Sequence, residues 1–301
     1  MPYSGFRIFV RAVPAIVLAA CSSTRGGSAV SSTEGSAAGS SASGVIAIPN
    51  QSLPPDADHA RERLNSSPRH GEWVMISVSP PDSIRAWVVY PERKTKAPVV
   101  VVIHEIFGLS TWIRAVADQL AADGFIAIAP DFLTSKLLPG TPDSVPMQEA
   151  MAAIRTLDPA QIQREIDATA RYGMSLPAAQ SRYGVVGFCW GGGISFEHAT
   201  HAPSLGASVV YYGTSPRTET LSNVRAPVLG LYGGSDARVD ATIPAADSAL
   251  RATGKIYSHS IFDGAGHGFL RQQTGMNGAN MRATQQAWPA TIAWFRHYLD
   301  R

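Results

Sequence analysis

A strand, a sharp turn and a helix follow one another around a short glycine-rich run with a thiol at the turn. The run from Gly187 to Gly193 reads GFCWGGG, follows the residues YGVV and precedes a helix-compatible stretch. The spacing matches the G-x-S-x-G nucleophile elbow, with Cys189 in the serine position. Gly187 and Gly191 flank the turn, where a Cβ atom would crowd a strained backbone. Because Cys189 stands at the start of a helix, we expect the helix dipole and free N–H groups to favour its thiolate.

The rest of the chain alternates between strand and helix patterns. A hairpin of residues 73–78 and 84–89 is expected at a sheet edge. Further strands are expected at 98–103, 125–129, 207–212, 227–232 and 256–262, and helices at 112–122, 159–174, 245–253 and 287–299, the last with Pro289 in its first turn. The pattern predicts an α/β domain with a mostly parallel, twisted sheet and helices on both faces.

Four side chains follow strands of this predicted sheet, where the chemistry of open α/β sheets gathers. They are Glu105, Cys189, Asp236 and His267. Nucleophile, acid and histidine occur in the chain order of the α/β-hydrolase triad. His267 can take the thiol proton near neutral pH, and Asp236 can fix its tautomer. We expect the backbone N–H groups of Trp190 and Ile106 to bind the oxyanion of a tetrahedral intermediate.

Each of these residues also has a purely structural interpretation. A buried cysteine is usually a small apolar side chain. Asp236 could cap the next turn, and His267 could be a loop histidine with satisfied hydrogen bonds. We interpret His104, His198 and His201 as structural, because they lack such a context.

Three motifs resemble the dienelactone hydrolase family of α/β-hydrolases. They are HEIFGL from His104, GFCWGG from Gly187 and GHGFLR from Gly266, and the similarity extends over residues 71–301. The resemblance implies hydrolysis of an ester or lactone through an acyl-cysteine intermediate. It implies that Glu105 contacts the resting thiol and helps to activate it, and that Arg271 holds a substrate carboxylate. Alternatively, Glu105 only pairs with Arg271, or Arg271 only solvates its loop.

One segment departs from the family. Well-known members carry an arginine and a tyrosine between Pro130 and the elbow, whereas this chain has PMQEAM from Pro146. We therefore expect a broader esterase rather than a dienelactone-specific enzyme. The expected apolar candidates for the pocket wall are Met147, Met151, Trp112, Trp190 and Tyr212. Of these, Tyr212 is also assigned to substrate binding.

The N-terminus has the pattern of an export signal. Residues 1–20 contain two arginines followed by a short apolar run. The sequence LAAC ending at Cys21 resembles the bacterial lipobox, which implies lipidation of Cys21 and anchoring on the periplasmic side of the outer membrane. The alternative is simple secretion, giving a secreted or soluble periplasmic protein. Residues 21–45 are predicted to be a Ser/Gly-rich tether, and residues 46–70 a surface extension.

Charge and cysteine usage exclude several other functions. Beyond residue 20, 23 basic residues balance 23 acidic ones, which argues against nucleic acid as a partner. Neither a metal site nor a cofactor is indicated. The expected partners are a small ester or lactone and, through the lipid anchor only, the membrane. The alternative function is a lipid-anchored binding module with this fold and little turnover.

Overall fold

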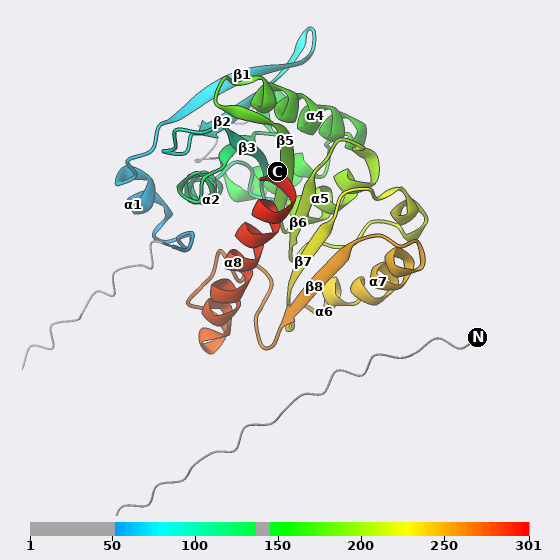
Figure 1. Cartoon of the computed structure of the whole chain (residues 1–301). Coiled ribbons are helices and arrows are strands. Elements are labelled where there is room, and N and C mark those ends of the chain that lie inside the picture. The colour runs from blue at the N-terminus through cyan, green and yellow to red at the C-terminus, as the bar shows by residue number, and fades with distance from the viewer. Residues whose placement is uncertain (1–51, 137–144, 301) are drawn as a thin grey trace, which may run out of the picture. The chain divides into compact units, whose positions relative to one another are not determined.

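One eight-stranded sheet organises the part of the chain that the structure describes. The computed structural model describes residues 52–136 and 145–300. The strand order is β1-β2-β4-β3-β5-β6-β7-β8, and every neighbouring pair from β4 to β8 is parallel (Figure 1). Only the β1–β2 and β2–β4 pairs are antiparallel. The expected edge hairpin and mostly parallel sheet are thus confirmed.

The elements alternate along the chain as the sequence pattern predicts. The strands are β1 Gly71–Ser79, β2 Asp82–Val89, β3 Ala97–Ile103, β4 Ile126–Pro130, β5 Ala179–Phe188, β6 Ala207–Tyr211, β7 Val228–Gly233 and β8 Tyr257–Phe262. The α-helices are α1 Ala60–Asn65, α2 Thr111–Ala122, α3 Met147–Ile154, α4 Pro159–Ser175, α5 Trp190–His201, α6 Ala237–Asp240, α7 Ile243–Ala252 and α8 Ala279–Leu299.

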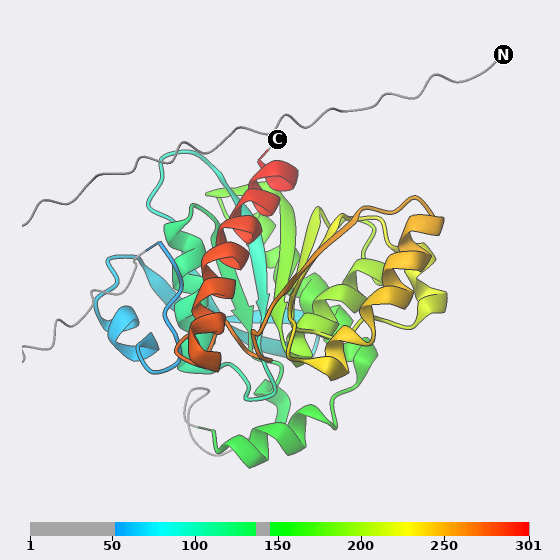
Figure 2. The same cartoon turned by 90° about the horizontal axis from the view of Figure 1, so that it is seen from below.

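Helices cover both faces of the sheet because its central strands are apolar on both sides. In β3, Val100 and Val102 belong to a core with α2 and α8, whereas Val99 and Val101 belong to a core with α4, α5 and α7. Successive side chains of a strand point to opposite faces, so one unbroken apolar run supplies two cores. Figure 2 shows α2 and α8 on one side of the sheet and α5 and α7 on the other.

The last helix starts earlier than expected. Pro289 lies inside α8 rather than in its first turn. A proline deprives the carbonyl four residues earlier of its donor. That residue is Gln285, which is exposed like Pro289 itself, so water can reach the unpaired carbonyl. The buried residues Ala279 and Ala283 continue the apolar face of the helix toward its N-terminus.

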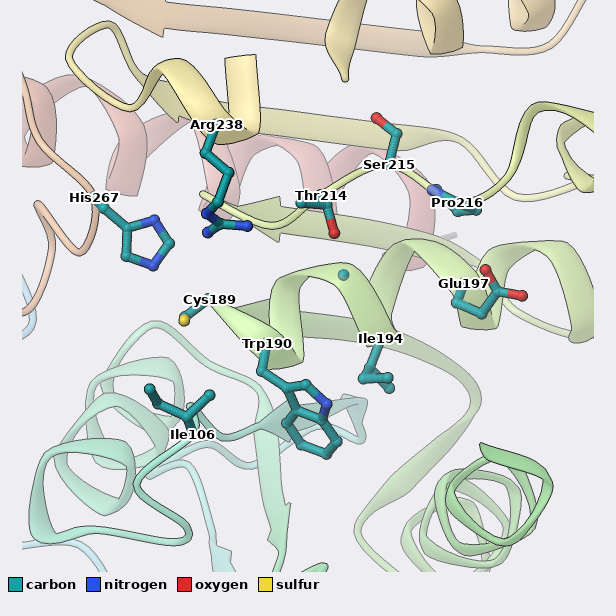
Figure 3. Close-up of a pocket in the computed structure, with 11 residues that line it drawn as sticks. Ile106, Cys189, Trp190, Ile194, Glu197, Thr214, Ser215, Pro216, Arg238 and His267 are labelled. Atoms are coloured by element: carbon teal, nitrogen blue, oxygen red, sulfur yellow. The ribbon is translucent and has the colours of Figure 1, made fainter. Parts of the chain in front are cut away.

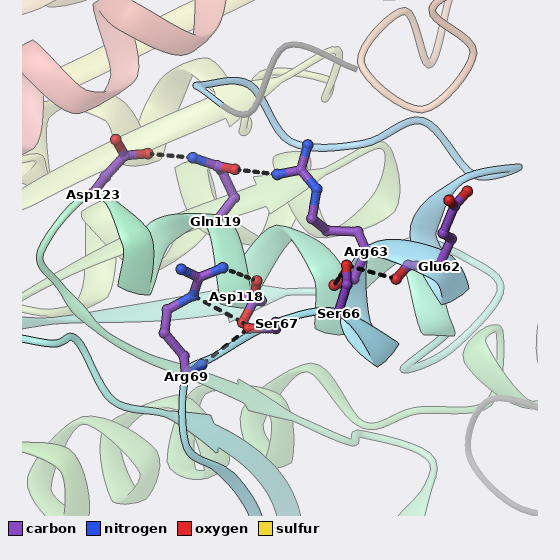
Figure 4. A network of polar contacts seen from close by, with 8 residues as sticks. All are labelled: Glu62, Arg63, Ser66, Ser67, Arg69, Asp118, Gln119 and Asp123. Carbon is purple, nitrogen blue, oxygen red and sulfur yellow. Dashed lines mark hydrogen bonds and ion pairs between the residues drawn. The ribbon is translucent and has the colours of Figure 1, made fainter. Parts of the chain in front are cut away.

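The described part of the 46–70 extension packs against α2. Asp118 accepts hydrogen bonds from Arg69, at 2.6 and 3.0 Å, and from Ser67, and Gln119 accepts one from Arg63 at 3.0 Å (Figure 4). Leu53 and Ala60 enter the core between the extension and the domain. This extension is therefore more deeply integrated than the expected surface segment.

The same extension also contacts the loop after β8. The Ala57 N–H donates to the Arg271 carbonyl at 3.0 Å, and the Gln273 amide donates to the Pro54 carbonyl at 2.9 Å.

Within the described residues, no helix has the length and apolar character needed to cross a bilayer. The expected signal, the lipidation site at Cys21 and the tether lie outside the described residues.

Candidate active site

The elbow between β5 and α5 places a cysteine in a strained backbone conformation. Cys189 has φ 57° and ψ −114°, a region that non-glycine residues rarely adopt. Its N–H donates to the Tyr211 carbonyl at 3.1 Å, and its carbonyl accepts from the Gly193 N–H at 3.2 Å. A Cβ atom on Gly187 would lie 1.8 Å from the Gly191 oxygen. The glycine is required because the strand and helix approach so closely.

The thiol of Cys189 is held in its protonated form. Burial first, and then the negative charge of Glu105, raise the pKa of Cys189 to about 11. Hydrogen bonds from the backbone N–H groups of Trp190 and Ile106, and the charge of Arg238, lower that pKa without offsetting the increase. The helix N-terminus therefore does not yield the resting thiolate that the sequence suggested, because burial and a neighbouring carboxylate outweigh it.

Glu105 lies behind the thiol in a nearly closed environment. The residue is 3% exposed, and burial raises its pKa to about 7, against the opposing charge of Arg271. The Arg271 Nε lies 3.3 Å from the Glu105 Oε2, although the two atoms do not meet the geometry of a hydrogen bond. The Arg271 guanidinium also lies over the Phe107 ring, at 4.9 Å from its centroid. This contact corresponds to the alternative in which Arg271 pairs with Glu105.

The histidine and the acid form a direct pair. The His267 Nδ1 lies 2.5 Å from the Asp236 Oδ2. Asp236 is buried and also accepts from the Val239 N–H at 3.4 Å, so the first turn of α6 fixes the carboxylate. The Asn280 side chain accepts from the Gly266 N–H at 2.9 Å and holds the histidine loop from α8. The imidazole is therefore oriented with Nε2 free for chemistry.

A cavity of about 540 Å³ opens at the carboxyl edge of the sheet (Figure 3). Four of the expected site residues line it, namely Ile106, Cys189, Trp190 and His267. Among the described residues no hydrogen bond joins the Cys189 sulfur to the imidazole, and the pKa of the thiol responds instead to Glu105 and to the two N–H groups. The cavity thus holds the cysteine and the histidine that the sequence predicts as nucleophile and base, without a hydrogen bond between them.

The other expected residues lie outside this cavity lining. Asp236 contacts His267. Glu105 acts on the pKa of Cys189, and Arg271 lies beside Glu105. Tyr212 is fully buried with no partner for its hydroxyl, and its ring packs edge-on against His267. Of the apolar wall candidates other than Tyr212, only Trp190 lines the cavity. Met147 and Met151 do not, and the Trp112 indole N–H donates to the Pro55 carbonyl at 3.0 Å.

Several lining residues were not expected from the sequence. They are Gly193, Ile194, Glu197, Thr214, Ser215, Pro216 and Arg238. Thr214 follows β6 and Arg238 follows β7, so the rule that sites gather after strand ends would have found both. Among the described residues, no group of three or more His, Cys, Asp or Glu side chains is arranged to hold a metal ion.

The family profile and the sequence relatives of this chain agree with each other. The profile of the dienelactone hydrolase family matches residues 84–299. A protein of Methylorubrum extorquens, provisionally named a carboxymethylenebutenolidase, is 31% identical over 71% of this chain and 77% of its own length.

Solved structures agree. The crystal structure of a provisionally named dienelactone hydrolase from Klebsiella pneumoniae has a TM-score of 0.68 and 27% identity, over 76% of this chain and 99% of that one. The dienelactone hydrolase from Anabaena variabilis, 24% identical over 77% of this chain and 99% of that one, shares the fold with a TM-score of 0.58. The chain is an α/β-hydrolase-fold enzyme, a hydrolase that belongs to the dienelactone hydrolase family.

Proposed function

We propose that this protein hydrolyses a carboxylic ester or lactone through an acyl-cysteine intermediate, with Cys189 as nucleophile. The main support is the shared cavity that contains Cys189 at its strained elbow and His267 paired with Asp236. The family membership and the relatives named for lactone hydrolysis support the same reaction class.

The resting contacts of the thiol imply an order of events. The N–H groups of Trp190 and Ile106 that lower the pKa of the resting thiol are the two donors expected to form the oxyanion hole. The sulfur must leave them before a substrate carbonyl oxygen can occupy their place. Turning the Cys189 side chain toward His267 accomplishes this release and brings the thiol to its base. We assign Glu105 as a positioning group, because its charge disfavours a thiolate in the resting place and so favours the turned position, where His267 accepts the proton.

The residues of the site can account for every proton transfer in the reaction. The thiol proton passes to His267 as the sulfur attacks the carbonyl carbon, and the oxyanion forms against the Ile106 and Trp190 N–H groups. Collapse of the intermediate breaks the bond to the leaving oxygen, which takes the proton from His267 and leaves a thioester. Water, deprotonated by His267, hydrolyses the thioester and restores the thiol.

Trapping of the acyl-enzyme tests this proposal. With p-nitrophenyl acetate, the wild-type protein should show a burst of p-nitrophenol and an acetylated Cys189 by mass spectrometry. Cys189→Ala should lose both, and Cys189→Ser should lose most turnover, because a hydroxyl gives up its proton far less readily than a thiol. Undiminished turnover in Cys189→Ala would refute the nucleophile. Binding of esters without any acyl-enzyme in the wild type would favour the binding-module alternative.

We also propose that the chain is exported and anchored through a lipid on Cys21, at the periplasmic side of the outer membrane. The support is the pattern of residues 1–21 in the sequence. Metabolic labelling with a palmitate analogue should mark the wild-type protein and not Cys21→Ala. Soluble, unlabelled protein in the periplasm or medium would instead indicate simple secretion.

A further inference from the structure

Arg238 places an uncompensated positive charge in the cavity. Its side chain extends from α6 toward the space between His267 and Thr214 (Figure 3). It makes no ion pair or side-chain hydrogen bond within the described residues. Of the described residues that line the cavity, only Glu197 carries a carboxylate, and its Oε1 lies 3.7 Å from the His201 Nδ1.

Arg271 is less available for a ligand than Arg238. Its Nε lies 3.3 Å from the Glu105 carboxylate, its guanidinium covers Phe107, and it does not line the cavity. Recruiting it for a substrate would leave a buried carboxylate without its neighbouring charge, which is costly. Using Arg238 breaks no existing ion pair.

The backbone around Arg238 is fixed although the side chain is exposed. The neighbouring Val239 is fully buried, and its N–H donates to the Asp236 carboxylate. Between α6 and α7, Thr242 accepts from the Ser215 N–H at 3.1 Å and thereby ties this segment to the loop that carries Thr214. Arg238 and Thr214 are consequently held on one wall of the cavity, opposite the apolar side chains of Ile106 and Ile194 (Figure 3).

We propose that Arg238 is a specificity-determining residue that binds a carboxylate of the ester or lactone substrate, with the Thr214 hydroxyl as a further donor. A guanidinium suits a planar carboxylate because two of its N–H groups can bind both oxygens. At the other end of the cavity, Glu197 repels a second negative charge. The favoured substrate is therefore a monoanion whose carboxylate lies on the Arg238 side. This inference rests on the proposed hydrolytic function of the same cavity.

Matched ester pairs test the assignment. One pair carries the carboxylate on the acyl side, mono-p-nitrophenyl glutarate against p-nitrophenyl pentanoate. The other carries it on the alcohol side, p-acetoxybenzoate against p-tolyl acetate. In at least one pair, Arg238→Gln should lower the ratio of kcat/KM between the anionic and the neutral ester about tenfold, as expected for losing a hydrogen bond between charged groups. Arg238→Lys should retain part of the preference.

Two other arginines provide controls for this experiment. Arg251→Gln makes the same change of charge at an exposed position in α7, paired with Asp247 outside the cavity, and should leave both ratios unchanged. Arg271→Gln should lower the rates of both members of a pair together, because it acts through Glu105. Unchanged ratios in Arg238→Gln, or a ratio that falls only in Arg271→Gln, would overturn the assignment.

Alkylation of Cys189 provides a measurement that does not depend on turnover. Iodoacetate carries a carboxylate and iodoacetamide is its neutral analogue. The ratio of their alkylation rates at Cys189, followed by peptide mass spectrometry, should fall in Arg238→Gln and stay constant in Arg251→Gln. If Cys189→Ala still hydrolyses the esters, the proposed mechanism fails whatever Arg238 does. If hydrolysis depends on Cys189 but neither the ester ratios nor the alkylation ratio responds to Arg238→Gln, only the carboxylate assignment fails.

Discussion

Removing the charge of Glu105 should make the thiol of Cys189 more reactive and the enzyme less active. Burial and that charge raise the pKa of Cys189 to about 11, from an ordinary value of 9.0. At pH 8 the wild-type thiol is then ionised in only about one molecule in a thousand. Full reversal of the increase would raise the thiolate population about 100-fold. Because burial persists in Glu105→Gln, we expect an increase of about tenfold, equivalent to about 1.4 kcal/mol.

The rate of alkylation of Cys189 by iodoacetamide measures this effect, since only the thiolate reacts. At pH 8 the variant should be alkylated about tenfold faster than the wild type. Its ester hydrolysis should fall, because a thiolate that Glu105 no longer disfavours in the resting place keeps occupying the expected oxyanion hole. The difference in alkylation should shrink below pH 7, where Glu105, with its pKa raised to about 7 by burial, becomes protonated. Glu197→Gln removes a carboxylate elsewhere in the cavity. It should change the alkylation rate and the rate of ester hydrolysis less than Glu105→Gln does. Equal or slower alkylation of Glu105→Gln would refute the electrostatic reasoning.

Three further results are expected. Gly191→Ala should destabilise the fold by about 1–3 kcal/mol in urea unfolding and abolish hydrolysis, because its Cβ would lie 2.4 Å from the His104 carbonyl oxygen. The free energy of unfolding should fall by at most about 3 kcal/mol between pH 4.5 and 7, and less in Glu105→Gln, because the folded state keeps the Glu105 proton that the unfolded state loses. Asp118→Asn should cost roughly 3 kcal/mol or more and expose residues 52–70 to proteolysis, because it breaks a buried ion pair; Asp247→Asn, in an exposed pair, should cost below about 1 kcal/mol.

Much of this architecture could be predicted because its signals are local. The valines of β3 indicate a strand buried on both faces, and the glycines around Cys189 indicate a close crossing of strand and helix. The placement of Asp236 and His267 followed from the parallel sheet, whose strands all end at one edge. The observed pair at 2.5 Å shows how far such topological reasoning extends.

The features that could not be predicted depend on the direction and burial of side chains. Nothing in the sequence shows that the Arg271 side chain lies against Glu105 while Arg238 extends into the cavity. The elevated pKa of Cys189 depends on the burial of the thiol itself and then on the charge of Glu105, which a motif does not reveal. Similarly, the contacts of residues 52–70 with α2 join positions that are about fifty residues apart in the chain.

The resting thiol has a consequence for the lifetime of the protein. Thiolates attack peroxides and disulfides and are thereby oxidised, whereas a protonated sulfur reacts slowly. Export, if it occurs as proposed, takes the molecule to surroundings where such oxidants persist. The sulfur of Cys189, kept neutral by burial and by the charge of Glu105 until an ester arrives, would then survive long idle periods without irreversible damage.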